Sequence, residues 1–363
     1  MYCLERIKVN LVTHDVFSKT TTLYFEMGKN HLYEEIFSRN IEYLRKEVAS
    51  QNAEFFFKIF FANDFPLKEN RYRTLLLDSS VANNKAELLY KNLYSIFSMI
   101  HVEQTDPFQL HLGEINDLTG LLFNGVLSKE KLRYRKYGKK KGMFNQESFS
   151  MREELERYLN DFNHIAKEKK VEPIFLYVNF LIDFSSMQVF DMQYNEVLGN
   201  LIFYILMLEN HFKAANYLSF YQKLYLYKTD YQDIFNQIDI QSKQGLADVM
   251  PLMSFFINIF NSIYVDLQET SRDYQYDQDI PINKTDYIEN TIYKLGDVFS
   301  KEDIREKHPS VSNSTINRTL KRLSDENVIR AAGVGRKAKW VKLQKNNTKH
   351  KFDGQIKMDL GEK

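Results

Sequence analysis

Apolar residues recur at helical spacing along most of this chain, from about residue 30 to residue 268. One apolar face is formed by Leu89, Leu93, Ile96, Phe97 and Ile100, and another by Leu118, Leu121, Leu122 and Val126. The same spacing predicts helices over residues 151–169, 173–187, 196–212, 216–227 and 250–268. Residues 6–13 and 20–26 differ, because their apolar positions alternate and include β-branched side chains, which predicts two short strands that can pair as a hairpin. The expected class is mainly α, with a small β-containing N-terminal segment.

Two further segments divide this helical series. Residues 133–144 contain two glycines around the run Lys139-Lys140-Lys141 and predict a hairpin or flap between helices, with the lysines in a solvated turn. Residues 269–284 are polar and form the clearest boundary in the chain. We therefore expect an N-terminal strand and helix segment over residues 1–74, a helical domain over 75–270, a linker over 271–284, a second domain over 285–343 and a basic tail over 344–363.

The length of 363 residues suggests two or three domains, and the composition is that of a folded protein. Hydrophobic residues make up 44% and charged residues 27%, with only 6 Pro and 13 Gly, which excludes collagen-like and disordered chains. No apolar run reaches the roughly 20 residues of a membrane span, and the N-terminus lacks a secretory signal, so we expect a cytoplasmic protein without membrane contact. The single cysteine, Cys3, and the scattered histidines give no metal-ligand spacing, so we expect no metal site.

Charge is distributed unevenly along the chain. The net charge is +1, yet residues 301–363 hold 16 Lys and Arg against 8 Asp and Glu, and the rest of the chain is correspondingly acidic. A basic terminal module on an acidic body predicts an anionic partner for that module. For residues 344–363 alone, we favour a solvated basic tail.

The basic part of the chain has the pattern of a helix-turn-helix domain. Ser300 is an N-cap followed by acidic residues, which begins a short helix that ends near Pro309, and a second helix is predicted from Asn313 to Asp325. The apolar face of this second helix consists of Ile316, Leu320 and Leu323. A turn with two glycines and a strand around Trp340 follow, so we expect a hairpin after the helices.

This order of elements resembles the winged helix-turn-helix of many bacterial regulators. The expected DNA-binding residues are Asn313, Ser314, Asn317, Arg318 and Lys321 on the second helix and Arg336, Lys337 and Lys339 on the wing. Short polar side chains suit base edges and cationic side chains suit phosphates, so the expected partner is double-stranded DNA. The alternative is a domain that serves only protein contact or dimerisation.

The helical series before the linker carries the elements of a known family. Residues 115–125 form a helix before the expected flap, Tyr134-Arg-Lys-Tyr follows, and Pro173 opens a helix that contains Phe184 eleven residues later. Over about residues 75–270 these features resemble the Fic (Fido) domain, whose enzymes commonly transfer AMP from ATP to a protein hydroxyl. A winged helix behind the domain is also frequent in that family.

The Fic signature H-P-F-x-x-G-N-G-R-x-x-R aligns without a gap to residues 188–199, but its reactive positions are replaced. The corresponding residues are Gln188, Phe190, Gln193, Tyr194, Asn195, Glu196 and Gly199. Gln188 stands in place of the catalytic His, and an amide takes no proton from a hydroxyl near neutral pH. Residues 193–195 replace the Gly-Asn-Gly that cradles phosphates, and Glu196 and Gly199 replace two arginines. Only Phe190, a packing residue, matches.

Many Fic proteins also carry an inhibitory helix with the motif S-x-x-x-E-(G/N), whose Glu competes for the phosphate-binding Arg. The best match begins at Ser79 and has Asn83 where that Glu would be. With the second Arg of the signature absent, such a Glu would have no partner. The resemblance therefore implies that the inhibitory motif is degenerate as well.

The sequence thus predicts a non-enzymatic regulator, in which a degenerate Fic scaffold supports dimerisation or partner binding and a winged helix binds DNA, in transcriptional regulation or in the control of a toxin or of phage defence. No catalytic residue and no cofactor are assigned. Expected partners are double-stranded DNA, a second copy of the chain in a homodimer, and a further protein. One alternative is a Fic-type AMP-transferase with an aberrant site. Another is a protein-interaction module without DNA binding.

Overall fold

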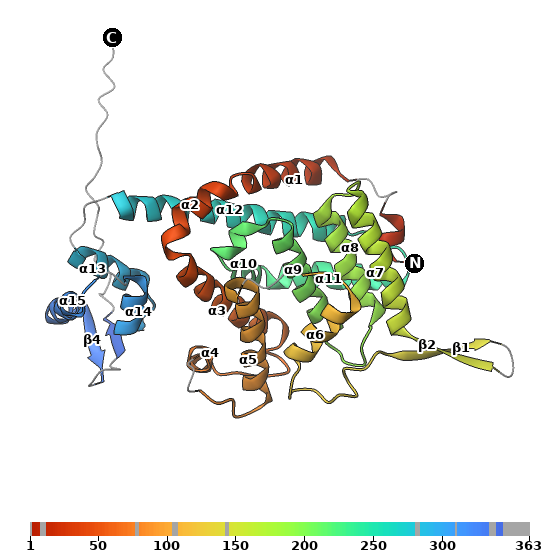
Figure 1. Ribbon diagram of the computed structural model, residues 1–363, viewed down its shortest axis with the longest axis horizontal. Helices are drawn as coiled ribbons and strands as arrows, with labels where there is room; N and C mark the ends of the chain where they lie inside the picture. The colour runs from red at the N-terminus through yellow and green to blue at the C-terminus, as the bar shows by residue number, and fades with distance from the viewer. Residues whose placement is uncertain are drawn as a thin grey trace, which may run out of the picture. The chain divides into compact units, whose positions relative to one another are not determined.

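The computed structural model spans residues 1–363 and describes residues 2–7, 12–76, 80–103, 108–141, 145–279, 284–308, 311–333 and 339–343. The chain forms two units, Met1–Tyr274 and Gln275–Lys363, each with its own hydrophobic core. The first unit holds the signature segment and the second holds the expected winged helix (Figure 1).

The N-terminal region is helical where we expected strands. A 3-10 helix spans Cys3–Arg6 and is followed by α1 (His14–Met27), α2 (Asn30–Phe37) and α3 (Ile41–Phe60). The strand predicted over residues 20–26 is wrong, because this segment lies in α1. The hydroxyls of Thr20, Thr21 and Thr22 donate to carbonyls four residues earlier at 2.7, 2.9 and 3.1 Å, which accommodates three threonines in a helix. Of the other predicted strand, residues 8–11 lie outside the described residues.

The N-terminal 3-10 helix is fixed to the core by one buried carboxylate. Asp183 accepts hydrogen bonds from the backbone N–H groups of Cys3 and Leu4 at 2.7 and 2.9 Å and from the Tyr158 hydroxyl at 3.0 Å. Burial raises the pKa of Asp183 to about 6. The first residues of the chain therefore belong to the helical core rather than to a separate β segment.

The helical series continues through the rest of the first unit. Its members are α4 (Glu69–Thr74), α5 (Lys85–Ser98), α6 (Leu112–Leu122), α7 (Met151–Glu168), α8 (Pro173–Met187), α9 (Asn195–Glu209), α10 (Phe220–Leu226), α11 (Lys228–Lys243) and α12 (Met250–Asp279), with a π-helical turn at Met99–Glu103 and short 3-10 helices at Ser38–Asn40 and Lys213–Asn216. The helices predicted around residues 151–169, 173–187 and 196–212 are confirmed. The pattern did not indicate α11 as a separate helix.

The centre of this unit is the pair α8 and α9. Both helices bury side chains all round, and α8 begins with Pro173 at its first turn and Glu172 as N-cap, whose carboxylate accepts from the backbone N–H groups of Ile174 and Phe175 at 3.0 and 2.6 Å. α1 and α12 lie side by side along one side of the unit, where Asn261 donates to the backbone carbonyl of Lys19 at 3.1 Å (Figure 1). The segment between α8 and α9 is the signature loop.

The expected flap is a β-hairpin. β1 (Lys136–Lys141) pairs antiparallel with β2 (Asn145–Ser150), in a register that places Lys136 opposite Ser150. Figure 1 shows this hairpin extending away from the helices. Residues 142–144 at its end lie outside the described residues.

α12 corrects the expected linker. We expected a linker over residues 271–284, but α12 continues to Asp279, because residues 269–280 contain no Pro or Gly and the next proline after Pro251 in the first turn is Pro281. Tyr274 also packs on Phe37 with ring centroids 5.1 Å apart. Within the described residues, Met250–Tyr274 is the one segment long and apolar enough to cross a membrane, and half of its most apolar window is buried inside the protein, as in a core helix.

The second unit contains the two helices and the C-terminal pair of strands expected from its sequence, and also a short strand before them that the sequence pattern did not predict. It contains α13 (Lys284–Lys294), β3 (Val298–Ser300), α14 (Lys301–Lys307), α15 (Asn313–Asp325), β4 (Ile329–Ala332) and β5 (Lys339–Lys342). The three strands form an antiparallel sheet in the order β3-β5-β4. Ser300 caps α14 through a capping box with Asp303, and α15 has the predicted bounds.

Candidate functional site

The signature loop begins with an amide that is bonded back to its own helix. Gln188 follows the last residue of α8 in the left-handed conformation, with φ 50° and ψ 56°. Its side-chain Nε2 donates to the carbonyl of Ser185 at 2.6 Å. Gln188 therefore caps the end of α8, and its amide cannot accept a proton near neutral pH, which is the property expected of it if the alignment with the Fic signature holds.

The loop is fixed to the strand that leads into the hairpin. Phe190 is buried, and its ring stacks on Tyr134 with centroids 5.1 Å apart. The backbones of the same two residues form an antiparallel bridge, and the Arg135 N–H donates to the Val189 carbonyl at 2.9 Å. Phe190 therefore packs the signature loop against the segment before the hairpin.

The interior of the loop is filled by Asn195. This residue is fully buried at the start of α9. Its Oδ1 accepts from the Phe190 N–H at 2.9 Å, and its Nδ2 donates to the carbonyls of Phe190 and Met192 at 3.1 and 2.7 Å. A phosphate group bound in this loop would have to displace these bonds.

The two residues before Asn195 bring a negative charge to the loop. The Tyr194 hydroxyl and the Gln193 Nε2 both donate to Asp64 Oδ2, at 2.9 and 3.0 Å. The Tyr194 ring packs between Phe61 and Phe123, with centroids 5.5 and 5.6 Å away. Burial raises the pKa of Tyr194 to about 12, and its bond to Asp64 acts in the same direction. No sequence pattern indicated Asp64, which lies about 130 residues earlier, in the loop after α3.

Glu196 and Gly199, the residues expected in place of the two signature arginines, both lie at the start of α9. Glu196 is half-buried, and its pKa is raised to about 7, first by burial and then by the charge of Asp239. Gly199 lies where α9 meets α8. A Cβ atom there would be 3.3 Å from Leu181 Cδ1, Phe184 Cδ1 and Ser185 Oγ. A side chain at residue 199 would therefore require these neighbours on α8 to shift.

A cleft of about 420 Å³ lies beside the loop. It is lined by Leu127, Lys131, Arg135, Gln188, Asp191, Met192, Gln193 and Tyr194. The cleft contains two cationic side chains, Lys131 and Arg135. The Arg135 Nε lies 3.8 Å from the Asp191 carboxylate, so Arg135 already has an anionic neighbour. Elsewhere in the part of the chain that the structure describes, no three His, Cys, Asp or Glu side chains gather closely enough to hold a metal ion.

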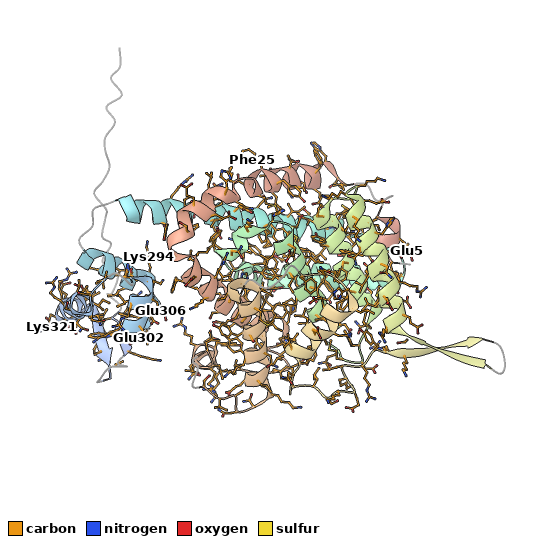
Figure 2. The ribbon with its side chains drawn as sticks, in the orientation of Figure 1. Glu5, Phe25, Lys294, Glu302, Glu306 and Lys321 are labelled. Atoms are coloured by element: carbon orange, nitrogen blue, oxygen red, sulfur yellow. The ribbon has the colours of Figure 1, made fainter. Side chains whose placement is uncertain are left out.

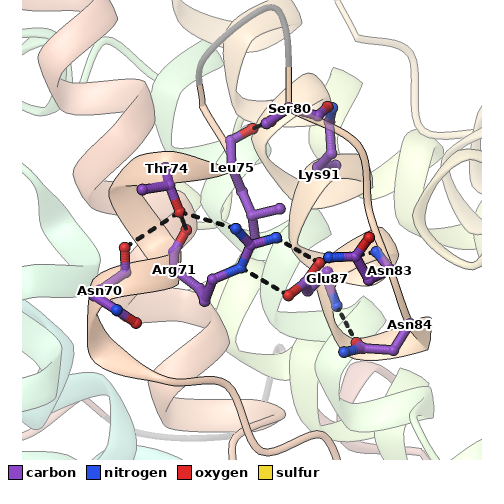
Figure 3. Close-up of polar contacts among 9 residues, drawn as sticks. All are labelled: Asn70, Arg71, Thr74, Leu75, Ser80, Asn83, Asn84, Glu87 and Lys91. Carbon is purple, nitrogen blue, oxygen red and sulfur yellow. Dashed lines mark hydrogen bonds and ion pairs between the residues drawn. The ribbon is translucent and has the colours of Figure 1, made fainter.

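The described part of the expected inhibitory motif, residues 80–84, does not lie on a helix. Ser79 is outside the described residues, and Asn83 lies in an extended segment just before α5. The Asn83 N–H donates to Glu87 Oε2 at 2.9 Å, and Asn84 Oδ1 accepts from the Glu87 N–H at 2.9 Å (Figure 3). Glu87 also pairs with Arg71 at 2.8 and 2.7 Å, which lowers the pKa of its carboxyl. Asn84 is the N-cap of α5, so the segment that contains Asn83 leads into this helix and does not form a helix itself.

The second candidate site is the exposed face of α15. Ile316, Leu320 and Leu323 are buried in the core of the second unit. The predicted DNA-binding residues Asn313, Ser314, Asn317, Arg318 and Lys321 are all exposed. Ser312 caps the helix through the Thr315 N–H at 3.3 Å. Figure 2 shows Lys321 on the outer side of this unit. The structure therefore brings all five side chains to one surface.

The charges on this surface are available to a partner. Arg318 and Lys321 form no ion pair within the described residues, whereas the neighbouring Arg322 pairs with Glu289 on α13. Lys339 is exposed in β5, and Arg336 and Lys337 lie outside the described residues. An uncompensated Arg and Lys beside short polar side chains suit a polyanion.

Comparison with known proteins identifies the fold. No protein family matches the sequence, and no curated protein matches it. Among solved structures, the fold is similar to the crystal structure of a Fic family protein from Desulfovibrio desulfuricans G20, with a TM-score of 0.55 at 15% identity over 93% of this chain and 99% of that chain. The chain has a Fic fold. The expected mainly α, Fic-like class is confirmed.

The Fic-like region is wider than the sequence resemblance indicated. That resemblance spanned about residues 75–270, whereas the structural match covers 93% of the chain. The first unit makes up about three quarters of the chain, so the match extends into the second unit. The N-terminal helices α1 to α3 had no recognisable Fic motif, and only their packing places them in the fold.

Proposed function

We propose that the protein is a non-enzymatic regulator that binds double-stranded DNA through its C-terminal unit, on a Fic fold that has lost nucleotide transfer. The observation that carries the proposal is the surface of α15, where Arg318 and Lys321 lie exposed beside Asn313, Ser314 and Asn317. Transcriptional control in the cytoplasm fits this surface best.

The order of elements in the second unit supports this reading. In helix-turn-helix proteins the second helix enters the major groove, and residues near its N-terminus contact base edges. α14 and α15 have this order, with Asn317 one turn into α15 and Arg318 beside it. The strands β4 and β5 follow and carry the exposed Lys339, which suits a phosphate contact beside the groove.

The loss of nucleotide transfer rests on the signature loop. A transferase needs a proton acceptor at the attacking hydroxyl and donors or cations at the phosphates. Gln188 supplies no such acceptor, Asn195 uses its hydrogen bonds on the loop itself, and the carboxylate of Asp64 faces the loop. These features favour a regulator over the alternative of an aberrant AMP-transferase.

Fragment selection tests the proposal. The full chain is incubated with sheared DNA of its own genome at about 0.1 M salt, and retained fragments are sequenced. We expect enrichment of a defined site. In the Asn317→Ala variant, discrimination between that site and its single-base variants should fall by roughly 1–3 kcal/mol at one position. The matched control is Lys167→Ala, an exposed change on α7 that should leave selection unchanged.

If no fragment is enriched, or if Asn317→Ala selects the same site with the same discrimination, α15 does not read DNA. The second unit would then be a protein-contact module, as the sequence alternative states.

A further inference from the structure

The β-hairpin of the first unit is strongly basic. Residues 129–141, which lead into β1 and form it, hold eight Lys and Arg against one Glu, although the chain before residue 301 is acidic overall. Lys139, Lys140 and Lys141, which we expected in a solvated turn, lie in β1 instead. The hairpin extends away from the helices (Figure 1). Within the described residues β1 and β2 pair only with each other, so both outer edges of the hairpin lack a strand partner.

The register of the two strands assigns their residues to two faces. Successive residues of a strand lie on opposite faces of the hairpin. One face, which we call the polar face, consists of Lys136, Gly138, Lys140, Gln146, Ser148 and Ser150. The other face consists of Tyr137, Lys139, Lys141, Asn145, Glu147 and Phe149. The polar face therefore holds two cationic residues and neither a carboxylate nor a large apolar residue.

The two faces also differ in which residues lie opposite each other. On the second face, Lys139 lies opposite the acidic Glu147. Tyr137 lies opposite Phe149 on that face. Opposite charges and aromatic pairs at facing positions stabilise a pair of strands, so the second face has a role in the hairpin itself. The two lysines of the polar face lie opposite a serine and a glutamine, so the partner strand does not balance their charge.

We propose that the polar face of the hairpin binds double-stranded DNA, as a second contact besides α15. This inference extends the proposed function, but the contact needs no contribution from α15. The major groove of B-DNA is about 12 Å wide and admits a two-stranded ribbon. Six residues in each strand give a length of about 20 Å, which exceeds the groove depth of about 8.5 Å. Lysines suit phosphates, and glutamine and serine suit base edges.

The composition of the polar face favours DNA over a peptide strand. A peptide that adds to a sheet edge gains specificity from pockets for its alternate side chains. Apart from Gly138, every residue of the polar face is Lys, Gln or Ser, which provides cations and hydrogen-bond donors but no apolar anchor. A glycine within a strand often marks a place where a ligand approaches the backbone closely. The charge and the small central residue both suit a polyanion.

Salt titration of the full chain on duplex DNA of random sequence tests this contact. Lys136→Ser/Lys140→Ser is compared with its parent in the wild type and in Arg318→Ala/Lys321→Ala, which removes the proposed contact of α15. In both backgrounds the log–log slope should fall by about two units. Lys136→Arg/Lys140→Arg keeps both charges and should keep the slope of the parent. An unchanged slope in Lys136→Ser/Lys140→Ser would overturn the proposal.

Neighbouring lysines on opposite faces provide the matched control. Lys140→Ser should lower the slope by about one unit, whereas Lys141→Ser, which removes the same charge from the other face, should lower it by less than about half a unit. Equal effects would overturn the assignment to the polar face. If Arg318→Ala/Lys321→Ala retains no duplex DNA at about 0.05 M salt while the wild type does, the hairpin contact fails and the contact of α15 stands. If that variant binds like the wild type, the contact of α15 fails and the hairpin is still tested.

Polyglutamate distinguishes DNA from an acidic protein as the partner. Labelled polyglutamate and labelled duplex DNA are titrated separately with the wild type and with Lys136→Ser/Lys140→Ser. We expect the variant to lose affinity for the duplex. A variant that binds the duplex as the wild type does, but binds polyglutamate more weakly, would identify an acidic protein as the partner of the polar face and overturn the proposal.

Discussion

Replacing Asn195 with alanine should open the signature loop, because this one side chain makes the bonds that close it. In Asn195→Ala the N–H of Phe190 and the carbonyls of Phe190 and Met192 lose partners at 2.9, 3.1 and 2.7 Å. Phe190 and Met192 are buried, so water does not readily replace the lost bonds. The change therefore tests whether the loop that would cradle a phosphate is closed by its own sequence.

The magnitude follows from the number of bonds. A net contribution of about 1 kcal/mol for each hydrogen bond gives a loss of about 3 kcal/mol for the three, which is more than a hundredfold in the opening equilibrium. The matched control is Asn200→Ala, five residues later on α9. Asn200 is also buried and bonded, to the Glu196 carbonyl at 3.0 Å and the Tyr231 hydroxyl at 2.9 Å, but it does not touch the loop.

The assay is hydrogen exchange of the peptide that covers residues 188–195, with urea unfolding in parallel. A local readout is needed because the chain has two units and its global unfolding is not a two-state reaction. Exchange in this peptide should rise more than a hundredfold in Asn195→Ala and little in Asn200→Ala. The reasoning is refuted if loop exchange changes by less than about threefold, because the hydrogen bonds would then contribute little to closure.

Three further changes probe the same unit. Gly199→Arg should lower the free energy of unfolding in urea by about 3 kcal/mol or more, because a Cβ atom alone would be 3.3 Å from Leu181, Phe184 and Ser185. An unchanged free energy of unfolding would contradict the close packing of α8 and α9. Burial raises the pKa of the Glu196 carboxyl to about 7 from an ordinary 4.5, so the folded state favours the protonated carboxyl and loses stability as the pH rises through 7. Glu196→Gln, which stays neutral, should therefore be more stable than the wild type at pH 8, and the difference in stability between the two proteins should be smaller at pH 5.5. Burial lowers the pKa of His101 to about 4 from 6.5, so its contribution is present above pH 6.5 and is lost as the pH falls toward 4. The stability difference between wild type and His101→Gln should therefore shrink by about 2 kcal/mol between pH 7.5 and 5, and a constant difference would contradict the burial of a neutral ring.

The sequence was sufficient to predict the bounds of helices that are set by signals within a few residues, such as caps and apolar spacing. α15 has its predicted bounds because Ser312 caps it and its apolar residues repeat at helical spacing. α8 likewise begins at Pro173 with Glu172 as its cap. The strand predicted at residues 20–26 failed because β-branched threonines favour a strand by propensity, whereas tertiary burial of Val16 and Leu23 on one face selects a helix.

The candidate site depended on contacts that no local pattern contains. The sequence alignment concerned residues 188–199 alone, and the structure adds which distant residues pack against this segment. Asp64 reaches Tyr194 across 130 residues of sequence, and Tyr134 stacks on Phe190 from the strand before the hairpin. Such pairings follow from the packing of α3, α8 and α9, which sequence spacing alone does not determine.

The most direct test of the account is the salt dependence of DNA binding by the full chain. The dissociation constant for a selected fragment is measured between about 0.05 and 0.3 M salt for the wild type, for Arg318→Ala/Lys321→Ala and for the control Lys46→Ala/Lys167→Ala, which removes two exposed cations from α3 and α7. The account predicts that the log–log slope falls by about two units in the α15 variant and stays unchanged in the control. An equal slope in all three proteins, or no retention of duplex DNA at about 0.1 M salt, would contradict DNA binding through α15.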